Sequence, residues 1–259
     1  MTSVIDHYAN HLAPIYLWMA GGMDTAIGRG QAEVEAICPR PAEGQLAVDL
    51  GAGFGMHAIP LADIGYSVLA IDSSSILLET LRNHIGTRPV KTVQDDLLLF
   101  RRHLRSPVDL IICMGDTLTH LPEKKAVEGL FDDVAESLND GGIFVVSFRD
   151  YTTPLIGPRR FIPVRSDTDR ILTCFLEYGN EIVTVHDILQ ERNGTVWKQE
   201  VSAYPKLRLS TDWVASALGA VGLHVRKEPG LAGMVRVIAE RRSQLSCHSQ
   251  AHSLPSKNA

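Results

Sequence analysis

Three glycines at alternate positions, Gly51, Gly53 and Gly55, follow an apolar run at residues 45–50. Glycine adopts backbone angles that other residues avoid, and its missing side chain lets a ligand approach main-chain N–H groups closely. A helical pattern begins at about Met56, so the segment predicts a strand, a tight turn and a helix. The spacing therefore predicts a seat for a small molecule at the carboxyl end of a strand.

Acidic residues end the next two apolar runs, at positions that suit a nucleoside. Asp72 lies 21 positions after Gly51, where a carboxylate can bind both hydroxyls of a ribose. Asp96 closes the third run, with Asp95 as the alternative register. A dinucleotide fingerprint requires a third small residue at the position held by Met56, which disfavours an NAD site. The spacing indicates an adenosine-containing ligand, although an isolated Asp after a strand is also a common helix cap.

A fourth apolar run ends at Met114 and leads into Gly115-Asp116-Thr117. Together the four strand ends resemble those of the class I S-adenosylmethionine-dependent methyltransferases, over roughly residues 45–240. The resemblance implies that the glycine turn carries the methionine part of the cofactor, Asp72 the ribose and Asp96 the adenine amino group. The implied cofactor is S-adenosyl-L-methionine, and the predicted cofactor-binding residues are Asp49, Gly51, Gly53, Gly55, Asp72, Ser73, Asp96, Leu97, Met114 and Tyr8.

Candidates for the chemistry of a methyl acceptor come from the cap and from the segments after the fourth and fifth strands. Asp116 and His120 are the predicted catalytic residues, and Tyr16, Arg149 and Tyr151 are the predicted substrate-binding residues. Loops at these positions carry the functional groups of doubly wound sheets. Each residue also has a structural alternative: an Asp can cap a helix, a His can bond to a helix start, an Arg can solvate a sheet edge and a Tyr can pack the cap.

The stretch at residues 112–122, ICMGDTLTHLP, looks like that of small-molecule enzymes such as glycine N-methyltransferase. This sequence has Asp116-Thr117 where that branch often has Asn-Ser, so the resemblance does not extend to an amino-acid substrate. It implies transfer of a methyl group to a nitrogen or oxygen of a small molecule, with nitrogen favoured. A non-catalytic sensor or scaffold that binds the same cofactor is the alternative, and an NAD-dependent oxidoreductase is a weaker one.

Composition disfavours several other classes of protein. The net charge of -5 gives no basic surface for a phosphate backbone, and the fourth strand lacks the [Asp/Asn]-Pro-Pro-[Tyr/Phe] motif of enzymes that methylate base amines. The four cysteines are scattered, no metal-ligand pattern is recognisable, and His57 reads as a structural or surface residue. The first residues lack the basic and apolar segments of a signal peptide. We expect a cytoplasmic enzyme with a small-molecule substrate and without nucleic-acid or membrane partners, in an oligomeric state that stays open.

Alternating strand and helix patterns predict the fold class. It is α/β: a Rossmann-like, seven-stranded, mostly parallel sheet with helices on both faces, an N-terminal helical cap and an antiparallel β insertion. We expect one methyltransferase domain at residues 1–242, followed by a disordered tail at 243–259. Within the domain, the cap covers residues 1–40, the cofactor-binding core 41–150, the insertion on the substrate side 151–205, and the C-terminal helix and strands 206–242.

The predicted elements have these bounds. Helices are expected at residues 5–18, 24–37, 56–64, 75–85, 98–104, 124–138 and 211–219, the last with Ser210 or Thr211 as its cap. Strands are expected at residues 45–50, 67–71, 90–93, 108–113, 142–148, 170–178, 181–190, 195–203, 222–226 and 235–239.

Overall fold

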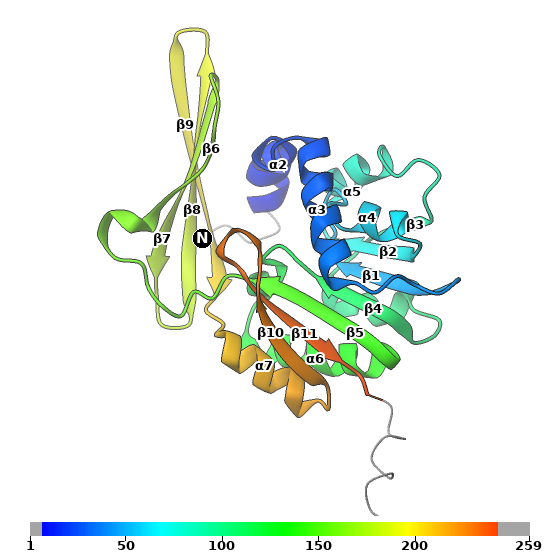
Figure 1. The fold of residues 1–259 in the computed structure, drawn as a ribbon. Helices are drawn as coiled ribbons and strands as arrows, with labels where there is room; N and C mark the ends of the chain where they lie inside the picture. The colour runs from blue at the N-terminus through cyan, green and yellow to red at the C-terminus, as the bar shows by residue number, and fades with distance from the viewer. Residues whose placement is uncertain (1–6, 243–259) are drawn as a thin grey trace, which may run out of the picture.

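A seven-stranded sheet forms the centre of the computed structural model, which describes residues 7–242. The strand order is β10-β11-β5-β4-β1-β2-β3; β1 to β5 are parallel, and β11 runs antiparallel to both of its neighbours, β5 and β10 (Figure 1). This confirms the predicted sheet and puts a topological switch point between β1 and β4, where open α/β sheets bind ligands. The strands are β1 (Leu46–Leu50), β2 (Ser67–Asp72), β3 (Val90–Gln94), β4 (Val108–Cys113), β5 (Leu138–Phe148), β10 (His224–Pro229) and β11 (Val235–Glu240).

Helices cover both faces of this sheet because successive residues of a strand point to opposite faces. On β1, Ala47 joins the hydrophobic cluster under α3, α4 and α5, whereas Val48 and Leu50 join the cluster under α6 and α7 (Figure 1). The helices are α3 (Met23–Ile37), α4 (Ala58–Asp63), α5 (Ser75–Arg82), α6 (Lys124–Ser137) and α7 (Thr211–Ala220).

Serine side chains begin two of these helices. Ser74 Oγ accepts the Leu77 N–H at the start of α5, and Ser210 Oγ accepts the Trp213 N–H at the start of α7, so Ser210 is the cap. Helix α4 begins two residues later than predicted, because the glycine turn continues past Gly55. The segment predicted as a helix at residues 98–104 is the 3-10 helix η2 (Leu97–His103).

The N-terminal cap consists of a π-helical turn, η1 (Tyr8–Leu12), followed by α2 (Ala13–Met19) and α3. Pro14 lies in the first turn of α2, where its missing N–H is tolerated. The expected helix start at residue 5 and the expected disorder at residues 243–259 fall outside the described residues. Within residues 7–242, no helix has the length and apolar character needed to span a bilayer.

A second sheet, which we call the arm, contains four antiparallel strands and projects from the core (Figure 1). Its strands are β6 (Phe161–Ser166), β7 (Arg170–Tyr178), β8 (Ile182–Asn193) and β9 (Val196–Leu207). The predicted antiparallel insertion is confirmed, but β6 was not expected. Pro163 and a shift of register between Pro163 and Arg165 interrupt the alternation that would have marked this strand.

The cap is tied to the arm at two points. The buried His7 side chain lies 3.1 Å from the Asp187 carboxylate of β8, measured between Nε2 and Oδ2. Trp18 Nε1 donates to Asp167 in the turn between β6 and β7. These contacts hold the cap over the carboxyl ends of the central strands, where the predicted site residues lie.

Candidate active site

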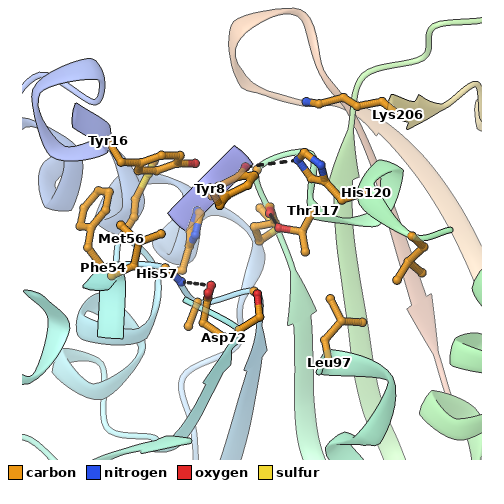
Figure 2. A pocket seen from close by; sticks show the side chains of 18 of the residues that line it. Tyr8, Tyr16, Phe54, Met56, His57, Asp72, Leu97, Thr117, His120 and Lys206 are labelled. Carbon is orange, nitrogen blue, oxygen red and sulfur yellow. Dashed lines mark hydrogen bonds between the residues drawn. The ribbon is translucent and has the colours of Figure 1, made fainter. Parts of the chain in front are cut away.

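A cavity of about 720 Å³ lies at the carboxyl ends of β1, β2 and β4, beneath the cap and beside the last residues of β9. Figure 2 shows Asp72 and Leu97 at one end of this cavity and His120 and Lys206 at the other. The predicted site residues that line it are Tyr8, Tyr16, Gly51, Gly53, Asp72, Ser73, Asp96, Leu97, Met114 and His120.

Two parts of the cavity differ in how they are built. The part lined by Gly51, Gly53, Asp72, Asp96 and Leu97, which belong to the central sheet and its loops, is called the core end. The part to which the arm contributes is called the arm end, and it is lined by Tyr8, His120, Ile182, Pro205 and Lys206.

The backbone of the turn at the core end adopts conformations that favour glycine at Gly51, Gly53 and Gly55. Gly51 has a φ of +76°, and a Cβ added to it would lie 2.5 Å from Thr117 Cγ2. Gly55 has a φ of +93°, and its added Cβ would lie 2.3 Å from Leu81 Cδ1. Both positions therefore require glycine for backbone conformation, and Gly51 also requires it for space, because its added Cβ would meet three atoms of the short Thr117 side chain. Gly53, at a φ of +54°, requires it for conformation alone.

The N–H groups of the three glycines of this turn are engaged within the protein. The Gly51 N–H donates to Ile71 O at 2.8 Å, and the Gly53 N–H donates to Asp72 Oδ2 at 2.7 Å. The Gly55 N–H donates to Ala52 O at 2.9 Å. The sequence predicts close approach of a ligand to the main chain here, and the structure adds that the three glycine N–H groups are bonded to protein oxygens. The turn offers close approach to the backbone but not the cluster of free N–H donors with which phosphate sites are built.

Asp72 lies on the cavity wall with both carboxylate oxygens partly used. Oδ2 accepts the Gly53 N–H and Oδ1 accepts the Ser74 N–H at 2.7 Å, and each oxygen keeps a lone pair for a further donor. Burial raises the pKa of Asp72, and these backbone N–H groups oppose the rise. The carboxylate is thus fixed in position and able to accept hydroxyl groups from the cavity.

The two acids after β3 have different surroundings. Asp96 lines the cavity, and its Oδ1 accepts the Leu98 N–H at 2.9 Å at the start of η2. Asp95 instead pairs with Arg102 and with His103, whose Nε2 lies 2.5 Å from Asp95 Oδ2. Of the two registers left open by the sequence, the structure turns Asp96 towards the cavity.

Asp49 and Gly55, both predicted to bind cofactor, lie outside the lining of the cavity. Asp49 is buried beneath the turn, and burial raises its pKa to about 6, against the opposing effect of nearby His57. Its Oδ2 has no hydrogen-bond partner among residues 7–242. Both residues therefore support the turn from behind.

The cavity is also lined by residues that sequence reasoning missed. Arg29 of α3 and His57, which follows the glycine turn, line the cavity at the core end, and Lys206 of β9 lines it at the arm end. His57 was expected to be structural or on the surface; it is buried and bonds through Nε2 to Glu33 Oε2 at 3.0 Å. Arg29 and Glu33 are four positions apart and so share one face of α3, the signal that could have identified them.

A tyrosine and a histidine meet at the arm end. Tyr8 Oη lies 3.2 Å from His120 Nε2, as the dashed line in Figure 2 shows. Burial, and then the charge of Lys206, lower the pKa of His120 to about 3, while burial raises the pKa of Tyr8 well above its usual value. The pair therefore presents an uncharged imidazole and an uncharged hydroxyl at neutral pH.

Asp116 lies behind the wall of the arm end, outside the lining. Its carboxylate accepts the Arg149 N–H at 2.9 Å, the Tyr151 hydroxyl at 3.0 Å and the Lys206 ammonium. Burial favours the neutral acid, but Lys206 and the Arg149 amide outweigh it and lower the pKa of Asp116. Asp116 is therefore a carboxylate committed to holding Lys206, and the geometry does not present it to the cavity as a base.

Arg149 and Tyr151, both predicted to bind substrate, are also absent from the cavity lining. The Arg149 guanidinium donates to Ala232 O at 2.8 Å, and Tyr151 packs in the small hydrophobic cluster at the base of the arm. The chain after β5 turns towards the arm rather than over the strand ends, which carries both side chains away from the cavity.

Comparison with known proteins relates this geometry to a family. Residues 47–142 match the family model described as a methyltransferase domain. Among curated proteins, the chain is 29% identical over 110 residues to glycine/sarcosine N-methyltransferase of Halorhodospira halochloris. That match covers 40% of this chain and 40% of the relative, so it spans only about two-fifths of the relative's length.

Solved structures share the fold over most of the chain. The methyltransferase CcbJ from Streptomyces caelestis superposes with a TM-score of 0.73 at 18% identity, covering 91% of this chain and 98% of CcbJ. The glycopeptide N-methyltransferase MtfA, in complex with S-adenosylmethionine, has a TM-score of 0.57 at 21% identity, covering 81% of this chain and 86% of MtfA. At these identities the likeness establishes the Rossmann-like methyltransferase fold.

Proposed function

We propose that this chain, whose residues 47–142 match a methyltransferase domain and whose fold is that of solved S-adenosylmethionine-dependent methyltransferases, transfers a methyl group from S-adenosyl-L-methionine to a nitrogen of a small-molecule acceptor. The core end supports this proposal, because the Asp72 carboxylate is fixed there beside a glycine turn whose three glycine amides are occupied. A pyrophosphate would need those amides as donors, whereas a nucleoside with a cationic sulfonium does not. This supports S-adenosylmethionine over a nicotinamide dinucleotide.

The residues present fit this cofactor along the length of the cavity. Asp72 would accept the two ribose hydroxyls, and Asp96 with the Leu97 backbone would hold the adenine. Arg29, a cation on the wall near the glycine turn, would hold the methionyl carboxylate by charged hydrogen bonds. The cavity volume of about 720 Å³ lies in the range of about 300–1,000 Å³ for small-molecule sites. When bound, the cofactor supplies an activated methyl group, and the protein supplies alignment.

The arm end suits an acceptor amine in its uncharged form. The acids that line the cavity within residues 7–242 are Asp72 and Asp96, both at the core end, so no carboxylate there stabilises an ammonium group. Lys206 adds positive charge on the acceptor side, which disfavours a protonated amine. Tyr8 Oη, which shares a hydrogen bond with neutral His120, can accept an amine N–H and so orient the amine's lone pair.

Nitrogen is proposed over oxygen because the arm end lacks an available strong base among the described residues. A hydroxyl acceptor benefits from a base with a pKa near the operating pH, but His120 has a pKa of about 3 and Asp116 is bound to Lys206. An uncharged amine needs no base before it attacks. The relatives described as glycine/sarcosine and glycopeptide N-methyltransferases also support nitrogen.

The proposal extends to the setting of the enzyme. Ile182 and Pro205 of the arm line the cavity, which supports the assignment of residues 151–205 to the substrate side of a single domain at residues 1–242. Cys38, Cys113 and Cys174 are free thiols, which fits a cytoplasmic, reducing location. We propose a small diffusible substrate without nucleic-acid partners, in keeping with the net charge of -5.

Two measurements test the function. Isothermal titration with S-adenosylhomocysteine should show saturable binding, and NADH should show none. A cofactor-consumption assay with pools of small amines and matched alcohols should then give product with amines first. Binding of NADH without S-adenosylhomocysteine would overturn the cofactor, and binding without turnover on any pool would identify a non-catalytic sensor instead.

A further inference from the structure

Helix α3 crosses the glycine turn at unusually close range. A Cβ added to Gly30 would lie 1.8 Å from the carbonyl oxygen of Met56, so any side chain there would push the helix away. Gly28, on the same helix, has nothing within 4 Å of its added Cβ. The backbone of α3 is therefore packed directly onto the end of the turn at one point, and that point adjoins Arg29.

A buried acid and a histidine tie the same helix to the same turn. Glu33 and His57 are 5% and 8% exposed, and Glu33 Oε2 lies 3.0 Å from His57 Nε2. The other oxygen of Glu33 is buried without a partner among residues 7–242. Burying a carboxylate in this way costs stability unless it is fully compensated, so the bond adds little to the net free energy of unfolding. Its clear effect is geometric, because it fixes where α3 lies on the turn.

Arg29 depends on that placement. Its guanidinium lines the cavity and donates to the carbonyl oxygens of Ala20 and Thr25 within the cap, which leaves further N–H donors for a ligand. Arg29 adjoins Gly30 and shares a helix face with Glu33. A displacement of α3 from the turn would therefore carry the guanidinium away from the cavity wall.

We propose that Glu33, acting through His57, is a positioning residue that docks α3 on the glycine turn and so holds Arg29 against the amino-acid end of the cofactor. The inference rests on the proposed function and deepens it, because it assigns recognition of the methionine part to the cap and not to the strand ends. The nucleoside part is bound at the core end and is independent of this contact. Disturbing the Glu33–His57 contact therefore weakens only ligands that carry the amino-acid end.

Two probes separate these parts. S-adenosylhomocysteine carries the amino-acid end, and 5′-methylthioadenosine lacks it. Titrated into the full chain, Glu33→Ala should weaken S-adenosylhomocysteine binding by about tenfold or more while changing 5′-methylthioadenosine binding less than about twofold. Glu33→Gln, whose amide oxygen can still accept from His57, should restore most of the affinity.

A second set of variants tests the docking without touching the acid. Gly30→Ala should give the same selective loss as Glu33→Ala, and Gly28→Ala, the matched control on the same helix, should bind both probes as the unchanged protein does. In an Arg29→Ala background, Glu33→Ala should cause no further loss, because its effect passes through Arg29. Thermal unfolding of each variant confirms that it is folded under the titration conditions.

The outcomes are distinct. Equal losses for both probes, or additive losses in the double variant, would overturn the positioning role and leave Glu33 as a residue of general stability. If the unchanged protein binds 5′-methylthioadenosine and S-adenosylhomocysteine equally well, recognition of the amino-acid end by the cap is wrong. If it binds neither, the proposed function itself fails.

Discussion

The core end and the arm end of the cavity are held together by different kinds of contact. At the core end, backbone groups fix the geometry: the Gly53 amide bonds to Asp72, 19 positions away in the chain. At the arm end, side chains meet across long separations, as in Tyr8 with His120 and Asp116 with Lys206. The geometry of the core end therefore rests on backbone groups bonded to the Asp72 carboxylate, whereas the arm end depends on contacts between side chains from distant segments.

This difference separates binding of the cofactor from selection of the acceptor. Backbone geometry suits a ligand that never changes, and the bonds of a turn are difficult to alter by substitution. Side chains brought together by tertiary packing can change one at a time without loss of the fold. Variants at the core end should therefore act on cofactor affinity, and variants at the arm end on turnover.

The largest effect is predicted for Gly51→Ala. The new methyl group would meet Thr117 at 2.5 Å in a backbone conformation that disfavours any side chain, so binding of S-adenosylhomocysteine should weaken more than about 100-fold. Calorimetric titration measures the affinity. Gly86→Ala is the control, because Gly86 has a φ of +58° but nothing within 4 Å of an added Cβ. That variant should lose some stability and keep its affinity; normal binding by Gly51→Ala would contradict the geometry of the core end.

Asp72→Ala should have the next largest effect. Loss of charged hydrogen bonds of about 1.5–3 kcal/mol corresponds to a weakening of cofactor affinity by about 10–150-fold, which the same titration measures. The variant also leaves the Gly53 and Ser74 amides without their acceptor, so its thermal unfolding midpoint should fall. Asp63→Ala removes an exposed carboxylate paired with Arg88 and should leave the affinity unchanged. Unaltered affinity in folded Asp72→Ala would remove Asp72 from the site.

At the arm end, His120→Asn should separate turnover from binding. Misplacement of the acceptor should lower kcat by up to about 100-fold, while the Kd for S-adenosylhomocysteine stays within about twofold. Steady-state kinetics with the best amine acceptor and titration of the cofactor measure the two quantities. His84→Asn, which changes an exposed histidine beyond α5, controls for the substitution itself. An equal loss in kcat and in affinity for S-adenosylhomocysteine would mean that the core end and the arm end do not act separately.

The lowered pKa of His120 predicts how the stability of the protein changes as the pH falls. Its pKa is about 3 in the folded protein, against an ordinary value of 6.5, so the unfolded chain binds a proton that the folded protein does not. Stability contributed by neutral His120 is therefore complete above about pH 6.5 and decreases as the pH falls towards 3. Urea unfolding between pH 7 and pH 4.5 should show a smaller decrease for His120→Asn than for the unchanged protein. Parallel curves would show that His120 is not buried in its neutral form.

The difference between the core end, built from backbone groups, and the arm end, built from distant side chains, also explains which parts of the site could be predicted from the sequence. Strand ends, glycine spacing and acids are local features, so the sheet, Gly51, Gly53 and Asp72 were predicted at their observed places. The sequence did not show that the Gly51 and Gly53 N–H groups are bonded within the protein, because their acceptors, Ile71 and Asp72, come from a different strand. Local patterns identify which residues lie at the edge of a sheet, but they do not show which hydrogen bonds those residues have already formed.

The arm end was less accessible to prediction for a related reason. Lys206 belongs to no recognisable sequence motif. It lines the cavity because the end of β9 packs beside η3 (Thr117–His120), where Lys206 pairs with Asp116, 90 positions earlier in the chain. Arg149 was expected in the site from its position after β5, but its guanidinium bonds to Ala232 O in the connection between β10 and β11. Side-chain direction in such segments follows from strand register, which the sequence leaves undetermined.

The smallest effect is predicted where the sequence left two registers open. Asp96→Ala removes a carboxylate that lines the cavity and accepts the Leu98 N–H, so S-adenosylhomocysteine should bind about threefold to tenfold more weakly. Asp95→Ala removes contacts with Arg102, with His103 and with the Asp96 N–H, none of which presents a group to the cavity, and should change the affinity by less than about twofold. The two variants are matched controls for each other, because they remove the same group from adjacent positions. The opposite order of effects would mean that the loop after β3 turns its other carboxylate to the ligand, and that backbone geometry alone does not determine the core end.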